Sequence, residues 1–143
     1  MHRVGGFDVH GKLTCHQFTF VAEYLGAISR FNTADMLFNA KGAKPQALHA
    51  EVDYTLPFGE KYSTTIGVAY GETWDALALN LPKNSYTTFI STSLLRDTIE
   101  SIEYRHDTDY AAADTASGRG ATTGITGTGR GRDSVTMQVG VYF

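Results

Sequence analysis

Histidine and carboxylate side chains are the groups in this 143-residue chain that could bind a metal or transfer protons. Those that a metal site would draw on are His10, His16, His49, His106, Glu51, Asp53 and Asp107. No two of these histidines have helix spacing, and they fall in different extended segments of the chain, whereas a metal needs its ligands to converge. The sequence therefore favours isolated polar histidines, and we predict no resident metal or cofactor.

Two further patterns suggest chemistry at first sight. Serine, histidine and aspartate are all present, but no serine stands in the Gly-x-Ser-x-Gly context of a nucleophile elbow. The glycine-rich run from Gly127 to Gly131 has the composition of a phosphate-binding loop. It precedes a predicted strand, however, and a phosphate loop opens a helix whose N-terminus holds the anion. We therefore expect a surface loop here and no enzyme activity.

The β-strands that must position these residues are recognised most clearly at the C-terminal end of the chain. Every second residue is apolar over 134–143, namely Val135, Met137, Val139, Val141 and Phe143. Small or polar residues stand between them, and only Tyr142 departs from the alternation. A period of two puts the apolar side chains on one face of a β-strand. A strand that ends the chain on an aromatic residue resembles the C-terminal insertion signal that the outer-membrane barrel assembly machinery recognises.

Similar alternation predicts about seven strands. Their ranges are 4–9, 13–26, 45–56, 62–72, 85–95, 98–110 and 134–143. The connections are short at 10–12, 57–61 and 96–97, and long at 27–44, 73–84 and 111–132. Most of these strands have roughly 9–13 residues, which suits a tilted membrane crossing, whereas soluble strands average about 5–6. Tight turns at one end and long loops at the other are typical of outer-membrane barrels.

The sequence thus predicts an all-β, antiparallel, up-and-down transmembrane β-barrel in the bacterial outer membrane, with the lipid bilayer as its partner. The net charge of −3 disfavours a nucleic-acid partner, because no basic stripe is available to neutralise phosphates. The single cysteine, Cys15, excludes an internal disulfide bond. No apolar run reaches the roughly 18 residues that a transmembrane helix needs.

Two observations predict that the barrel is incomplete. Residues 1–6 are not followed by the apolar stretch of 7–15 residues that a secretory signal contains. An odd number of strands also departs from the even numbers of single-chain bacterial barrels. We therefore expect 1–143 to be the C-terminal portion of one outer-membrane barrel domain that has further strands upstream.

If the apolar faces of the strands meet lipid, their polar faces line the interior. The side chains expected there are Glu23, His49, Glu51, Asp53, Glu103 and Arg105. We predict that this set helps to shape a polar pore, with Arg105 paired to a neighbouring carboxylate. The simpler alternative is a set of solvated wall charges that confers no selectivity.

Aromatic residues at two levels of the predicted strands fit the girdles of a membrane barrel. Tyr24, Tyr54, Tyr70 and Tyr104 are the expected members of these girdles at the bilayer interfaces. Aromatic packing inside a soluble β-sandwich is the competing interpretation of the same residues.

Four stretches of the chain resemble a known family. They read VAEYLGA at 21–27, KPQA at 44–47, WDALALNLPK at 74–83 and IEYRHDTDY at 102–110. Together they are similar to the LbtU-type siderophore porins, and the resemblance extends from about residue 7 to residue 143. It implies an outer-membrane β-barrel associated with ferric-siderophore uptake by passive, pore-type transport. The resemblance covers only the C-terminal part of the members of that family.

Two other functions remain compatible with the sequence. One is an outer-membrane barrel with a structural or adhesive role, whose long loops bind partners. The other is a soluble β-barrel or sandwich that binds a ligand, which the strand lengths and the terminal aromatic residue disfavour.

Overall fold

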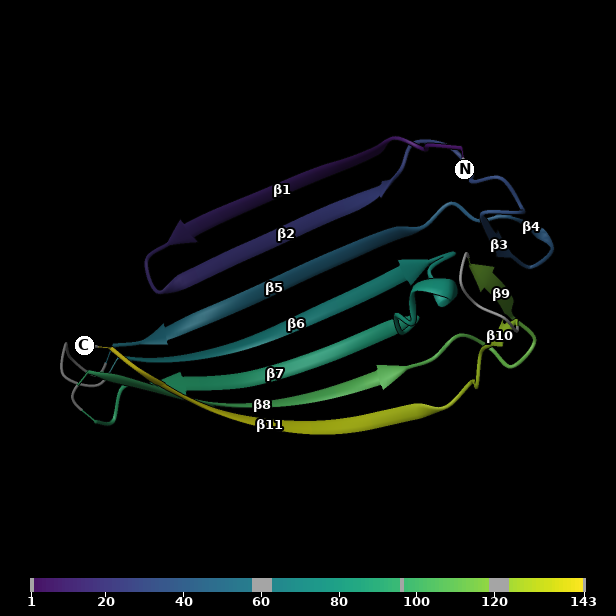
Figure 1. Cartoon of the computed structure of the whole chain (residues 1–143). Coiled ribbons are helices and arrows are strands. Elements are labelled where there is room, and N and C mark those ends of the chain that lie inside the picture. The colour runs from purple at the N-terminus through teal and green to yellow at the C-terminus, as the bar shows by residue number, and fades with distance from the viewer. Residues whose placement is uncertain (1, 58–62, 96, 119–123, 143) are drawn as a thin grey trace.

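The computed structural model describes residues 2–57, 63–95, 97–118 and 124–142. Seven long strands form one antiparallel sheet in the order β1-β2-β5-β6-β7-β8-β11 (Figure 1). They are β1 (Gly6–Cys15), β2 (Phe18–Ala27), β5 (Gln46–Leu56), β6 (Thr64–Trp74), β7 (Asn84–Thr92), β8 (Thr98–Thr108) and β11 (Gly131–Val141). Each long strand pairs with the long strand that follows it in the chain, so the predicted all-β, up-and-down arrangement of seven strands is confirmed.

The connections differ in length at the two ends of this sheet. At one end, β1 and β2 are joined by only His16 and Gln17, and β7 and β8 are joined by 93–97. At the other end lie the connections 28–45, 75–83 and 109–130 (Figure 1). The predicted asymmetry between a short-turn end and a long-loop end is therefore confirmed for the described residues, and β11 finishes at the short-turn end. Of the short turn predicted at 57–61, residues 58–61 lie outside the described residues.

The first hairpin differs from the sequence prediction. A turn at 10–12 was expected from Gly11, but β1 continues through this position and the chain turns at His16, whose φ is 54°. Gly11 pairs with Ala22 in the ladder between β1 and β2. The alternation of Phe7, Val9 and Leu13 continues through Gly11, and the pairing it permits outweighs the local turn preference of glycine.

The three long connections fold together into a small second unit, which we call the cap. It comprises β3 (Met36–Phe38), β4 (Lys41–Gly42), the 3₁₀ turn η1 (Leu77–Leu79), β9 (Thr115–Gly118) and β10 (Ile125–Thr126). Its strands form a sheet in the order β10-β9-β3-β4. The long connection predicted at 111–132 contains regular structure, because β9 pairs with β3 and β10, and β11 already begins at Gly131.

The cap contains the hydrophobic core of the described residues. Leu77, Tyr110 and Ala116 are buried there, and Phe38 and Ile125 pack against them. The ring of Phe38 meets the ring of Tyr110 edge to face, with 5.6 Å between centroids. These residues come from all three long connections, so the core fixes the loops to one another.

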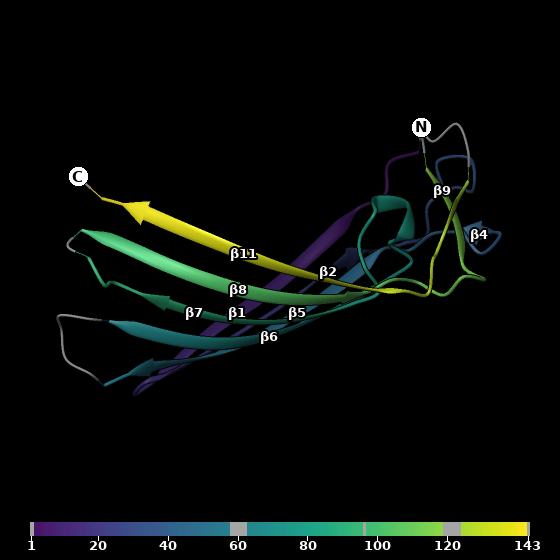
Figure 2. The same ribbon diagram turned by 90° about the horizontal axis from the view of Figure 1, so that it is seen from below.

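The seven-stranded sheet is curved, and the cap rises from its long-loop end (Figure 2). The sheet is not closed into a barrel: across the described residues β1 has β2 as its one partner and β11 has β8. Both outer strands therefore present an open edge, in contrast to a closed barrel, in which the first and last strands pair.

Candidate functional site

The pairing register brings the six predicted interior side chains to one face of the sheet. Directly opposed residues in antiparallel strands share a face, and so do alternate residues along one strand. Glu23 lies opposite His49. Across β5, β6, β7 and β8, the directly opposed residues of one row are Glu51, Ala69, Thr87 and Arg105. Those of the neighbouring row are Asp53, Gly67, Phe89 and Glu103. We call this side, which carries Glu23, His49, Glu51, Asp53, Glu103 and Arg105, the polar face.

Two carboxylates lie near the middle of the polar face. The His49 Nε2 atom is 3.5 Å from Glu51 Oε2. Asp53 Oδ1 has no hydrogen-bond partner within the part of the chain that the structure describes. This atom lies above Gly67 beside the ring of Phe89, and a Cβ at Gly67 would collide with both. Glycine at this position therefore makes room for the Asp53 carboxylate.

Arg105 has the carboxylate partner that was expected for it, and the partner is Asp107. The Arg105 Nε atom donates to Asp107 Oδ1 at 2.7 Å. Arg132, directly opposite on β11, donates from Nη2 to Asp107 Oδ2 at 3.1 Å. Asp107 is only 6% exposed. In the sequence, Asp107 stands out only as a possible metal ligand. Its contact with Arg132 has no local signal, because the two residues are 25 positions apart.

The opposite side of the sheet, which we call the apolar face, is continuous across all seven strands. Its members in register include Leu13, Phe20, Val52, Val68, Thr88, Tyr104 and Val135. The alternation predicted for Val135, Met137, Val139 and Val141 places all four on this face. Phe143, the last residue of the predicted insertion signal, lies outside the described residues.

Aromatic side chains gather at both ends of the apolar face. Toward the cap, the rings of Tyr24 and Trp74 are 6.5 Å apart and those of Tyr70 and Tyr86 are 5.2 Å apart. At the short-turn end, the ring of Tyr54 lies 4.8 Å from that of Phe18. The four tyrosines expected in girdles thus share the apolar face: Tyr24 and Tyr70 lie nearer the cap and Tyr54 lies nearer the turns, whereas Tyr104 lies in a middle row with Thr88 and Val68.

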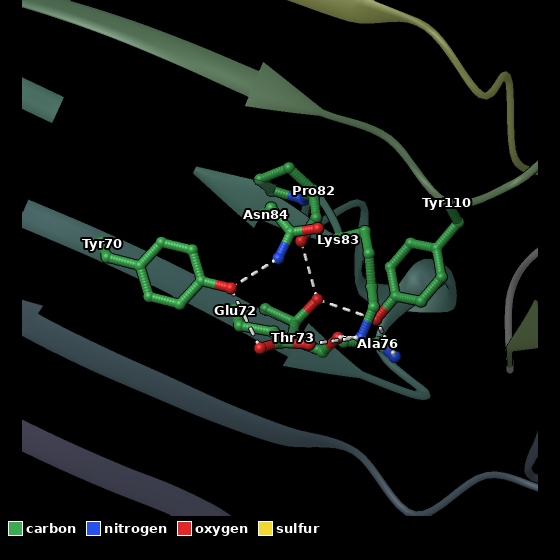
Figure 3. A network of polar contacts seen from close by, with 8 residues as sticks. All are labelled: Tyr70, Glu72, Thr73, Ala76, Pro82, Lys83, Asn84 and Tyr110. Atoms are coloured by element: carbon green, nitrogen blue, oxygen red, sulfur yellow. Dashed lines mark hydrogen bonds and ion pairs between the residues drawn. The ribbon is translucent and has the colours of Figure 1, made fainter. Parts of the chain in front are cut away.

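Polar contacts join the cap to the sheet (Figure 3). The Thr73 hydroxyl on the polar face donates to Pro82 O at 2.7 Å and lies 2.7 Å from the Tyr110 hydroxyl. The Tyr110 hydroxyl in turn accepts the Ala76 N–H at 3.1 Å. Lys83 Nζ donates to Thr73 O at 2.8 Å and to Glu72 Oε1 at 3.0 Å. The cap is therefore attached to the polar face through Thr73.

Two side chains near this attachment, Tyr110 and Asp109, have shifted pKa values. Burial raises the pKa of the Tyr110 phenol, since the residue is only 3% exposed. Partial burial alone would raise the pKa of Asp109, but hydrogen bonds from Thr128 and from the Tyr110 N–H hold it below its usual value. Tyr110 therefore stays protonated and Asp109 stays ionised near neutral pH.

The histidines do not converge. His10 and His49 are on the polar face, His16 is in the first turn, and His106 is on the apolar face, where its Nδ1 is 2.7 Å from Asp133 Oδ1. Across the described residues, no group of three or more histidine, cysteine or acidic side chains is arranged to hold a metal ion. No helix in the described ranges is both long and apolar enough to cross a membrane.

Comparison with known proteins finds relatives of which this chain matches one segment. It is 43% identical over 141 residues to UPF0422 protein lpl2888 of Legionella pneumophila strain Lens, covering 95% of this chain and 26% of that protein. It is 36% identical over 144 residues to a UPF0422 protein of Coxiella burnetii, covering 99% of this chain and 31% of that protein. No family model and no solved structure matches. Nearly the whole of this chain is therefore similar to between a quarter and a third of the UPF0422 proteins of these two bacteria.

Proposed function

We propose that this chain is part of an outer-membrane β-barrel whose apolar face contacts lipid and whose polar face lines an aqueous interior. The observation that carries the proposal is the uncovered apolar face. Met137 is 74% exposed and Val135 is 67% exposed, and no large side chain of the described residues is fully buried. A contiguous apolar surface of this kind marks a contact with lipid or protein.

The dimensions of the sheet support lipid as the covering medium. Its long strands have 9 to 11 residues, which is the length of a tilted membrane-crossing strand, about 9–11 residues. The rings of Tyr24 and Trp74 lie near the cap end of the apolar face and those of Phe18 and Tyr54 near the turn end, where the interfaces of a bilayer would be. On β6, Ile66 and Val68 lie between Thr64 and Glu72, which would bring these polar residues to the headgroup level.

The open edges support a barrel completed by strands outside this chain. Unpaired backbone groups at the edges of β1 and β11 would be costly in lipid, where only closed barrels satisfy every strand. Since this chain matches 26% to 31% of its relatives' length, those proteins have room for further strands.

The solute of such a barrel follows from the family resemblance. We propose passive, pore-type passage associated with ferric-siderophore uptake, as the similarity to the LbtU-type siderophore porins implies. The polar face, where Glu51 and Asp53 lie near the middle of the sheet, supports a hydrated path. An outer-membrane barrel with a structural or adhesive role is the alternative.

Single-cysteine labelling tests the lipid contact. In a Cys15→Ser background, Val68→Cys and Ala69→Cys place a fluorophore on opposite faces of the central strand β6. In lipid vesicles, brominated lipids should quench the label at position 68, and aqueous iodide should quench the label at position 69. Equal quenching of both labels by iodide would reject a membrane-spanning sheet.

Siderophore uptake is tested separately. A strain that lacks the gene for this protein should accumulate less iron from its own ferric siderophore than the parent strain, and the restored gene should recover uptake. Unchanged uptake together with retained lipid contact would favour the structural or adhesive role.

A further inference from the structure

We propose that the junction between the cap and the polar face binds a small organic anion, recognised by Arg130 and Arg132 through carboxylate or phosphate oxygens. A cavity of about 380 Å³ lies there. Its lining combines Leu77, Leu81, Pro82 and Ile125 with Asp107, Asp109, Thr126, Thr128, Arg130 and Arg132. This volume is at the lower end of the range for small-molecule pockets, about 300–1,000 Å³. The site does not depend on whether the sheet spans a membrane.

The two acidic groups of the pocket are already satisfied within the protein. Asp107 accepts Arg105 Nε at one oxygen and Arg132 Nη2 at the other. Asp109 Oδ2 accepts both the N–H and the hydroxyl of Thr128, at 2.8 and 2.7 Å, and Oδ1 accepts the Tyr110 N–H at 2.8 Å. Every oxygen of these two carboxylates therefore already accepts at least one hydrogen bond from the protein.

The two arginines, in contrast, keep unused donors. Within the described residues the Arg130 guanidinium has no hydrogen-bond or ion-pair partner, while its main chain bonds Asp109 and Thr128. Arg132 uses Nη2 for Asp107, and its side chain is 78% exposed, so its other N–H groups face solvent. Guanidinium groups of this kind bind carboxylate and phosphate in bidentate geometry.

The balance of charge and polarity selects an anion of modest size. Within the lining, Arg130 and Arg132 balance the carboxylates of Asp107 and Asp109. Arg105, which lies outside the lining but donates to Asp107, adds one positive charge beside it. The apolar wall of Leu77, Leu81, Pro82 and Ile125 lowers the local dielectric and strengthens the attraction. An anion with a short carbon skeleton matches both parts of the lining.

Calorimetric titration of the protein in uncharged detergent at low salt tests the site, with citrate and inorganic phosphate as probes and sucrose as the neutral control. We expect saturable binding of at least one anion and none of sucrose. Arg130→Gln should raise the Kd about tenfold, because it removes charge-assisted hydrogen bonds without breaking any contact in the free protein. Arg3→Gln, which removes the same charge from the exposed N-terminal segment, should leave the Kd unchanged.

Asp107→Asn should change the Kd in the opposite direction to Arg130→Gln. It removes a negative charge and releases Arg105 and Arg132, so the Kd for the anion should fall, provided that circular dichroism shows a folded protein. Binding of citrate alone identifies carboxylate recognition, and binding of phosphate alone identifies phosphate recognition. The proposal is overturned if neither anion binds, if Arg130→Gln leaves the Kd unchanged, or if folded Asp107→Asn binds more weakly. If Asp107→Asn does not fold, Arg130→Gln decides alone.

Discussion

The hydroxyl oxygens of Thr73 and Tyr110 lie 2.7 Å apart and join two parts of the chain that are 37 residues apart in sequence. Thr73 belongs to the polar face of β6, and Tyr110 belongs to the core of the cap. The cap is thereby held over the end of the polar face by a partly buried hydrogen bond next to its own core. The orientation of the cap should depend strongly on this contact.

Removal of the Tyr110 hydroxyl tests this dependence. Tyr110→Phe keeps the ring against Phe38 but leaves the Ala76 N–H without its acceptor. We expect a loss of about 1–3 kcal/mol in the stability of the cap, the cost of a buried polar group without a partner. Hydrogen exchange of the Ala76 amide should accelerate accordingly. Tyr142→Phe, at an exposed tyrosine, serves as the control, and equal protection in both variants would contradict the prediction.

Two glycines in the sheet should respond oppositely to alanine. A methyl group at Gly67 would collide with the Phe89 ring and Asp53, whereas a methyl group at Gly11 meets no atom within 4 Å. Gly67→Ala should lower the free energy of unfolding by about 1–3 kcal/mol. Gly11→Ala should be neutral or stabilise by up to about 1 kcal/mol, because alanine reduces the freedom of the unfolded chain. Urea unfolding in detergent measures both, and a harmless Gly67→Ala would show that Asp53 and Phe89 rearrange easily.

The carboxylates on the polar face should influence ion selectivity if that face lines a pore. We expect the double variant Glu51→Gln, Asp53→Asn to reduce the preference for cations in planar-bilayer recordings, since two negative charges are removed. Lys41→Gln, a change of charge in an exposed part of the cap, should have a smaller effect. Unchanged selectivity in the double variant would leave these residues as solvated wall charges.

The loop held by Asp109 should loosen in acid. The folded pKa of Asp109 is lower than its unfolded value of about 4, so its ionised form stabilises the loop fully above that pH. The stabilisation is lost as the pH falls below about 4 and through the folded pKa. Hydrogen exchange at Thr128, corrected for its intrinsic pH dependence, should therefore show falling protection in acid. Asp109→Asn should abolish this dependence, and an identical profile in the variant would assign it elsewhere.

The long strands and their two faces are predictable from the sequence because alternation with a period of two is a local signal. Val135, Met137 and Val139 share a face for this reason, and so do Glu51 and Asp53. The first hairpin is less predictable, since Gly11 has a strong local turn preference and its extended conformation depends on pairing with Ala22.

The cap cannot be predicted from alternation in the sequence, and the reason differs from that for the first hairpin. Its core joins Phe38, Leu77 and Ala116, which come from three connections with no periodic pattern of their own. The clamp on Asp107 is similar, because Arg132 reaches it only through the register of β8 with β11. Contacts between distant, short segments leave no local signal, so both features emerge only from the folded chain.

The strand order determines how a protein built on this sheet can gain or lose strands. Every pairing in the seven-stranded sheet joins strands that are consecutive among the long strands, and every short turn closes a hairpin at the same end. Hairpins can therefore be gained or lost at the β1 edge as whole modules, without rethreading the remaining strands. The sheet behaves as a linear array whose repeating unit is the hairpin, and each unit brings its own share of the apolar face and of the polar face.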